Sequence, residues 1–272
     1  MKTTTKTILF LSLLSVSVFG QKLEHEKGHI DENKFRQLKY ELATPNSQRT
    51  ASGAPGHEYT QQKVDYVMDI RLDEASDKVY GEETITYHNN SKDNLEYLWL
   101  QLDQNMRAPH SKTPLSKPKG TSGWQKPQEF VDENMKKAKD FGFKIESVKY
   151  DNGRDLSHTI NWTMMRINLD KPLAPGETFT FSIKWNYLIN DINADGGRSG
   201  LETFPDGNKN YTIAQFFPRL CVYDNVEGWQ NMQFFGRSEW ALEFGDYDVK
   251  LTVPADHILD CLLYTSPSPR DA

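Results

Sequence analysis

The feature that most constrains the fold is an alternation of apolar and polar side chains with a period of two residues. In residues 64–72 five apolar side chains from Val64 to Leu72 fall on one parity and the charged ones on the other, and the run 79–87 repeats the pattern with Glu83 among its inward positions. Because successive side chains of a β-strand point to opposite faces, each run predicts a half-buried strand. An Asp/Ser-rich stretch, residues 73–78, separates the two runs and predicts an antiparallel hairpin.

Further alternating runs follow at spacings typical of an all-β domain. Tyr97 and Trp99 are the bulky residues expected to pack in the third strand, and Asn152-Gly153 predicts a hairpin turn. The predicted strands are 95–102, 143–150, 164–169, 178–186, 211–217 and 240–254, with a tight turn at 172–177. We therefore expect an all-β fold, a large curved antiparallel β-sandwich, with one short helix at 129–140.

Composition narrows the functional classes. The chain has 272 residues, of which 37% are hydrophobic, which suits one large β domain or two small ones. The net charge of -6 is spread along the sequence, so there is no basic stripe for a nucleic acid. The sequence also contains no G-x-S-x-G elbow, Gly-rich phosphate loop or Cys/His cluster, so serine hydrolase chemistry and nucleotide binding are not supported.

The N-terminus has the pattern of a secretory signal. Lys2 and Lys6 precede an apolar stretch at 8–19, and Gly20 ends a cleavage-type sequence, so residues 1–20 are predicted to be removed on export. The alternative is a buried N-terminal helix. The expected location is periplasmic or extracellular. No later stretch has the roughly 20 apolar residues of a membrane-spanning helix, so none is expected.

The remaining chain is expected to divide into three parts: a polar arm at 21–61, a β domain at 62–260 and a non-native tail at 261–272. The tail replaces the strand pattern with a Ser-Pro repeat and resembles a translated sequencing adapter, although a natural flexible Ser/Pro tail is the alternative. The cysteines are Cys221 and Cys261, so at most one disulfide could form. If the tail is non-native, Cys221 is alone.

His25, Glu26 and His29 match H-E-x-x-H, the zinc-binding pattern of metallopeptidases. That chemistry needs a rigid helix, but Gly28 interrupts the motif and Gln48 stands where a glutamate ligand would follow. We interpret the match as coincidental and predict no metal site in this chain.

Asp191, Asn193, Asp195 and Glu202 match the calcium loop of an EF-hand. An EF-hand needs a helix on each side, whereas the preceding segment is predicted to be a strand. Calcium binding and a solvated Gly-rich loop both remain open for this segment.

A series of short motifs between residues 34 and 260 resembles the N-terminal region of aminopeptidase-N-like zinc metallopeptidases, especially those of Bacteroidetes-type bacteria. Their order is more specific than any one of them. The motifs are TASGAPGHEYTQQ at 50–62, YVMDIRLD at 66–73, GEETITY at 81–87, LWLQLDQN at 98–105, LAPGE at 173–177, AQFFPR at 214–219, YD at 223–224, FGDYDV at 244–249 and TVPAD at 252–256.

The resemblance implies a saddle-shaped β domain that precedes a catalytic domain carrying G-x-M-E-N and the zinc motif. The chain is expected to stop before that domain and to be inactive by itself, with zinc and peptide substrates belonging to the intact parent. The resemblance also implies that Gln215 helps hold the substrate α-amino group, although the second polar position of its motif is Phe217 here. The alternative for Gln215 is an amide that caps a strand end.

Two other classes compete with this interpretation. One is a secreted β-sandwich that binds peptide or carbohydrate through aromatic faces, for which Trp162, Trp185, Trp229 and Trp240 are the candidates. The other is a purely structural cell-surface module.

Overall fold

The computed structural model describes residues 45–113, 139–195, 198–236 and 241–260. All of these lie in one compact unit of the chain, Gln37–Ala272. The predicted signal peptide, the H-E-x-x-H motif, residues 129–138 of the predicted helix and the tail at 261–272 lie outside the described residues, as does the arm before residue 45. Within the described ranges, no helix is both long and apolar enough to span a bilayer.

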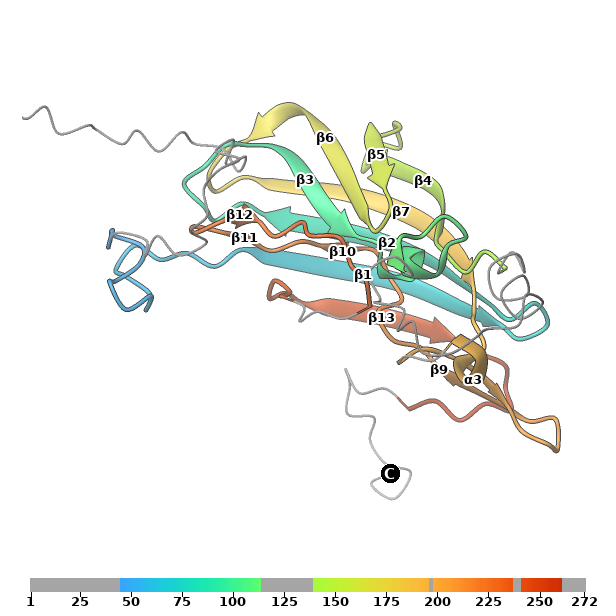
Figure 1. Ribbon diagram of the computed structural model, residues 1–272. Coiled ribbons are helices and arrows are strands. Elements are labelled where there is room, and N and C mark those ends of the chain that lie inside the picture. The colour runs from blue at the N-terminus through green and yellow to red at the C-terminus, as the bar shows by residue number, and fades with distance from the viewer. Residues whose placement is uncertain (1–44, 114–138, 196–197, 237–240, 261–272) are drawn as a thin grey trace, which may run out of the picture. The chain divides into compact units, whose positions relative to one another are not determined.

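The larger sheet has five strands in the order β13-β1-β2-β7-β4 (Figure 1). They are β1 Lys63–Asp73, β2 Lys78–His88, β4 Lys144–Tyr150, β7 Thr178–Leu188 and β13 Tyr247–Thr252. β1, β2 and β7 pair antiparallel along their whole lengths, with Met68 opposite Glu83 and Glu83 opposite Ile183. The predicted hairpin at 64–87 is therefore confirmed.

The second sheet has four strands in the order β10-β3-β6-β5. They are β3 Leu95–Gln101, β5 His158–Asn161, β6 Met164–Leu173 and β10 Arg219–Leu220. The smaller elements are the 3-10 helix η1 Asp103–Arg107, the single-turn helix α3 Ile192–Asp195, and the two-stranded pairs β8 Gly200–Thr203 with β9 Lys209–Thr212 and β11 Tyr223–Asp224 with β12 Gly228–Trp229.

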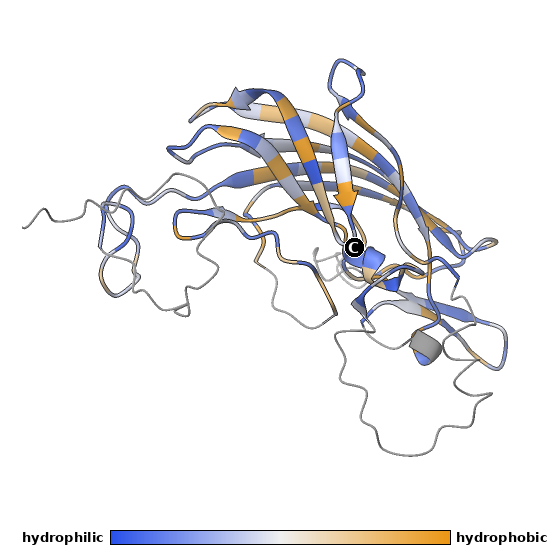
Figure 2. Cartoon of the chain, turned by 45° about the horizontal axis from the view of Figure 1, so that its top comes forward, coloured by the Kyte–Doolittle hydropathy of each residue, from blue (hydrophilic) through white to orange (hydrophobic). Residues whose placement is uncertain are grey.

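One hydrophobic core is shared by the two sheets. Ile85, Phe181 and Ile183 from the larger sheet are fully buried in the same cluster as Leu98 and Ile167 from the smaller one. Hydrophobic and hydrophilic residues alternate along the strands in Figure 2, as the period of two requires. This arrangement confirms the predicted all-β fold.

The C-terminal strand differs from the prediction in length and direction. The run predicted at 240–254 forms a strand only at β13, and β13 pairs with β1 in parallel, with Tyr66 opposite Tyr247 and Ile70 opposite Leu251. A parallel pair needs a long connection between its strands, and here almost the whole domain lies between them. The sheets are thus antiparallel as predicted except at this edge, where β13 and β1 form a parallel pair.

Tyr97 and Trp99 of β3 pack against the core as predicted, although they are half-buried, and Leu98 and Leu100 are the fully buried residues. A bulge between Leu95 and Tyr97 shifts the register of this strand. Other local details differ from the prediction. The strand predicted at 164–169 continues to Leu173, so the turn is shorter than 172–177 and is closed by Gly176 at φ +78°. The short strand β5 was not predicted.

Candidate functional site

The segment that carries the predicted site residue, Gln215, links β9 to β10. Gln215 has φ 55°, a left-handed backbone conformation that is uncommon for residues other than glycine. The strand predicted at 211–217 therefore ends at Thr212, and residues 213–218 form an irregular connection. Strained backbone of this kind persists only where the surroundings hold it in place.

Buried Gln104, in the helix η1, supplies part of that support. Its Nε2 donates to the carbonyl oxygen of Ala214 at 3.2 Å and lies 3.5 Å from that of Gln215. Ala214 N in turn donates to Ser199 Oγ at 3.3 Å. Gln104 belongs to the LWLQLDQN motif, but the sequence predicted no role for it, because its partners lie 110 and 111 positions away.

Aromatic side chains hold the next two residues. The Phe217 ring packs edge-on against Tyr66 with ring centroids 5.4 Å apart, and Phe216 lies 6.5 Å from Trp185. Phe217 is only 6% exposed, so the second position of the motif has become an anchor in the core. It is not available for a substrate.

Gln215 as a whole is half-buried, but its Nε2 is inaccessible to solvent and has no hydrogen-bond acceptor among the described residues. The amide nitrogen therefore caps no backbone carbonyl of the described chain. Since an amide can rotate by half a turn, the same position can present either a donor or, as Oε1, an acceptor.

Glu83 is another unusual polar group. It lies in β2, in the same sheet as Tyr66 and Trp185. It is fully buried, and neither carboxylate oxygen has a partner among the described residues. Burial raises the pKa of Glu83 well above its usual value, and the Trp185 indole opposes this rise. Burial therefore favours the protonated, neutral form of this carboxyl group. The sequence signal for this buried carboxyl group is the inward position of Glu83 in the alternating run 79–87.

The segment ends at a buried ion pair. Arg219 in β10 contacts Asp103 of η1 through Nη2, and both side chains are almost inaccessible to solvent. Burial raises the pKa of Asp103, while the Arg219 guanidinium opposes that shift. Gln104, Ser199 and the Arg219–Asp103 pair thus hold the backbone on both sides of Gln215.

Three side chains that could serve as metal ligands lie close together away from Gln215. Glu74, Asp256 and His257 have ligand atoms that all lie within 4.8 Å of one another, and His257 Nε2 is 3.3 Å from Glu74 Oε2. Catalytic peptidase zinc is held by two histidines and a glutamate, whereas this group has a single histidine and two carboxylates. It does not fit that metal, and no catalytic step is assigned to it.

The predicted calcium segment is not framed by the two helices of an EF-hand. It follows strand β7, and Glu202 lies in strand β8, opposite Asn210. Asp191 Oδ1 accepts from the backbone N–H of Asn193 at 2.8 Å, which starts the short helix α3. Calcium binding at this segment stays a hypothesis.

Two of the four tryptophans of the alternative binding module are buried in the core. Trp185 and Trp229 are 1% and 6% exposed, so they belong to the core. Trp162 is 37% exposed, and the Lys112 ammonium lies 3.6 Å from its ring centroid. Trp240 lies outside the described residues. The prediction that Trp185 and Trp229 contribute to an aromatic binding face is therefore wrong.

No protein-family model matches the sequence, and no curated protein matches it. Solved structures with some similarity include M1 zinc metallopeptidases. A two-domain mutant bound to L-tryptophan is 15% identical with a TM-score of 0.38, over 74% of this chain and 35% of that one. A mutant from Deinococcus radiodurans bound to a Tyr-Ser-Ala substrate is 14% identical with a TM-score of 0.37, over 72% and 33%. The chain thus spans about a third of the length of these structures. Identities and TM-scores this low assign no function.

Proposed function

We propose that this chain is the non-catalytic N-terminal β domain of an exported zinc aminopeptidase of the Bacteroidetes type, and that it is inactive by itself. The ordered motifs between residues 34 and 260 support the family, and the all-β fold agrees with what they imply. In this proposal the chain forms one wall of the cleft in which the intact enzyme removes N-terminal residues from peptides. The catalytic zinc belongs to a domain beyond residue 260.

The observation that carries the proposal is the constrained amide of Gln215. Its backbone is held in a strained conformation by Gln104, and its neighbours are anchored by Tyr66 and Trp185. A desolvated ammonium group needs fixed acceptors. Nε2 is buried without a partner here, so a side-chain rotation that turns the amide outward would relieve that cost and present Oε1 as an acceptor for the ammonium.

Two experiments test the proposal. Extending the gene past residue 260 should reveal G-x-M-E-N and a zinc motif with a distal glutamate, and a stop codon there would rule the proposal out. The purified chain should show no turnover of an aminoacyl chromogenic substrate with added zinc. Turnover that disappears in His25→Ala would show instead that the N-terminal motif binds catalytic zinc.

A second candidate, a secreted binding module, is favoured by a surface cavity of about 570 Å³ beside the β6–β7 turn. Half-buried Tyr150 and Phe179 line it together with Asp170 and Lys171, which suits a small polar ligand with an apolar face. Titration with peptides and oligosaccharides, followed by fluorescence, tests this candidate. Saturable binding that Lys171→Ala weakens would support it, and no binding at millimolar ligand would remove it.

A further inference from the structure

Three side chains from two distant parts of the chain lie together where β1 and β13 end. Glu74 is the first residue after β1, and Asp256 and His257 belong to the turn that follows β13. Because β1 and β13 are parallel neighbours, their C-terminal ends lie at the same end of the sheet, with Arg71 opposite Thr252 (Figure 1). The parallel pairing therefore brings Glu74 next to a residue 183 positions away.

The three side chains have the spacing of ligands to one ion. One carboxylate oxygen of Glu74, one of Asp256 and one ring nitrogen of His257 all lie within 4.8 Å of one another. His257 Nε2 is 3.3 Å from Glu74 Oε2. Ligand atoms at about 2.0–2.2 Å from a tetrahedral zinc ion are roughly 3.4 Å apart, so small side-chain rotations let all three atoms contact one ion.

Strand β9 supports the site from one side. Lys209 Nζ donates to the backbone carbonyl of Glu74 at 3.2 Å, and the Tyr211 ring lies beside the His257 ring, with centroids 5.7 Å apart. Lys209 and Tyr211 are themselves fixed, because both donate to Asp77 Oδ1 at 2.7 Å. The imidazole and the turn that carries Glu74 are thus positioned in advance, which lowers the entropy cost of binding an ion.

The charge and exposure of the site favour a cation from solvent. Glu74 and Asp256 contribute two carboxylates, while the neighbouring Lys209 ammonium is paired with Asp77. The side chains of Glu74 and His257 are 36% and 18% exposed, and Asp256 is exposed. An ion can therefore reach the ligand atoms without a change in the fold.

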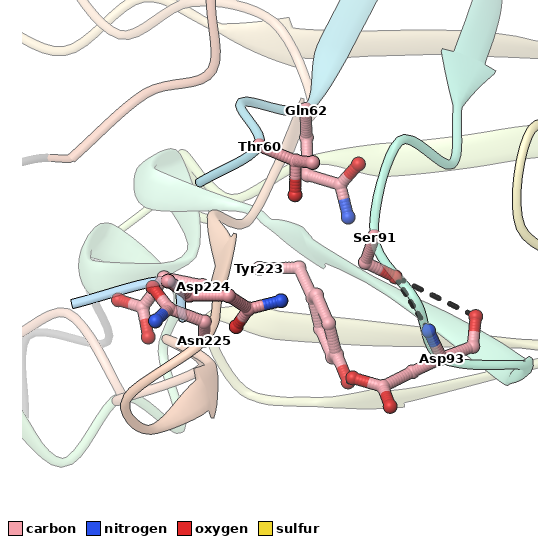
Figure 3. A pocket seen from close by; sticks show the side chains of 8 residues that line it. Thr60, Gln62, Ser91, Asp93, Tyr223, Asp224 and Asn225 are labelled. Carbon is pink, nitrogen blue, oxygen red and sulfur yellow. Dashed lines mark hydrogen bonds between the residues drawn. The ribbon is translucent and has the colours of Figure 1, made fainter. Parts of the chain in front are cut away.

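Another pair of carboxylates in the described chain lacks these properties. Asp93 and Asp224 line a small polar pocket together with Tyr223 (Figure 3), and none of its described lining residues is a histidine. Asp224 already accepts from two backbone N–H groups and from the Gln230 amide, and Asp93 accepts from the Tyr223 hydroxyl. These carboxylates serve donors of the protein itself, so the imidazole is what distinguishes the Glu74 group.

We propose that Glu74, Asp256 and His257 bind one first-row divalent transition-metal ion, and that this ion ties the segment after β13 to the β1–β2 turn. Imidazole suits Zn²⁺, Ni²⁺ and Cu²⁺, whereas Ca²⁺ and Mg²⁺ take oxygen ligands. Solvent completes the coordination of an ion held by three protein ligands. The role of the ion is structural, and the site stands independently of the proposed peptidase function.

Calorimetric titration of the full chain with Zn²⁺, after treatment with a chelator, tests the proposal. The starting protein carries His25→Ala and His29→Ala, so that the H-E-x-x-H match cannot contribute. One saturable site is expected, and His257→Ala and Asp256→Asn should each weaken binding by about tenfold or more. Unchanged binding in either variant, or no saturation at millimolar Zn²⁺, overturns the proposal.

His88 provides a matched control, because its Nε2 lies 2.8 Å from one carboxylate, that of Asp65. His88→Ala should leave Zn²⁺ binding unchanged, and a loss as large as that of His257→Ala overturns the assignment of the site. Ca²⁺ at the same concentration should not displace Zn²⁺. Displacement would overturn the assignment to a transition metal.

Hydrogen exchange tests whether the ion ties the segment after β13. Zn²⁺ at about 100 times its Kd should raise the Tm by about 5 °C or more. It should also slow amide exchange in residues 253–260 of the starting protein, but not in His257→Ala. Exchange in 253–260 that saturating Zn²⁺ leaves unchanged would overturn the proposed tie.

Discussion

Arg219 and Asp103 form an ion pair inside the protein, with side chains that are 6% and 1% exposed. The pair ties strand β10 to the helix η1, and Arg219 also donates to Gln101 Oε1 at 3.0 Å. It therefore fixes one end of the segment that carries Gln215, while Gln104 from the same helix holds the other end.

Breaking this pair should be costly. Asp103→Ala leaves the Arg219 guanidinium buried without a counter-charge, so we expect a loss of about 3–5 kcal/mol in the free energy of unfolding. Urea denaturation at pH 7 measures it. The double variant Asp103→Leu with Arg219→Met should recover most of the loss, because it removes both charges. A double variant no more stable than Asp103→Ala would contradict this account.

Glu83 should make stability depend on pH. Its pKa is raised in the folded protein and near its ordinary value of 4.5 in the unfolded chain. The stabilising contribution of its proton is complete below pH 4.5 and declines as the pH rises toward the folded pKa, by up to about 1.4 kcal/mol per pH unit.

Glu83→Gln removes this titration while keeping a neutral side chain of the same shape. We expect the stability of the variant relative to the wild type to increase between pH 5 and pH 8. Denaturation at several pH values checks this, and parallel pH profiles for the two proteins would show that Glu83 is not protonated in the folded state. Glu82→Gln is the matched control, because Glu82 points outward to Lys184.

Gly81 is required by the Trp185 indole. A Cβ at Gly81 would overlap the indole ring, so Gly81→Ala must displace Trp185 from the core. We expect a loss of about 1–3 kcal/mol and a changed near-UV circular dichroism spectrum. In a Trp185→Leu background, Gly81→Ala should lower the free energy of unfolding by less than it does in the wild type. An alanine variant with unchanged stability and spectrum would show that the indole moves freely.

Replacing Gln215 with glycine should raise the stability of the chain and weaken its binding of peptide. Gln215→Gly relieves the positive φ and should stabilise the chain by about 1 kcal/mol, whereas Gln215→Ala, which keeps the strain, should not. Both should weaken binding of a peptide with a free α-amino group, measured by calorimetry against the N-acetylated peptide. Equal binding by all three proteins would remove Gln215 from the proposed substrate site without affecting the fold.

The sequence alone determined the strands whose pattern is local. The period of two in β1, β2 and β7 predicted which faces are buried, since alternation of side chains follows from the backbone of a single strand. The β1–β2 turn was equally visible, and the inward position of Glu83 was present in the same pattern.

Tertiary structure alone decided the features that depend on distant partners. The parallel pairing of β13 with β1, the bulge after Leu95 and the left-handed conformation of Gln215 each depend on contacts across the domain. The role of Gln104 is of the same kind. No local propensity encodes them, because hydrogen-bond partners and packing neighbours exist only once the two sheets have closed on their common core.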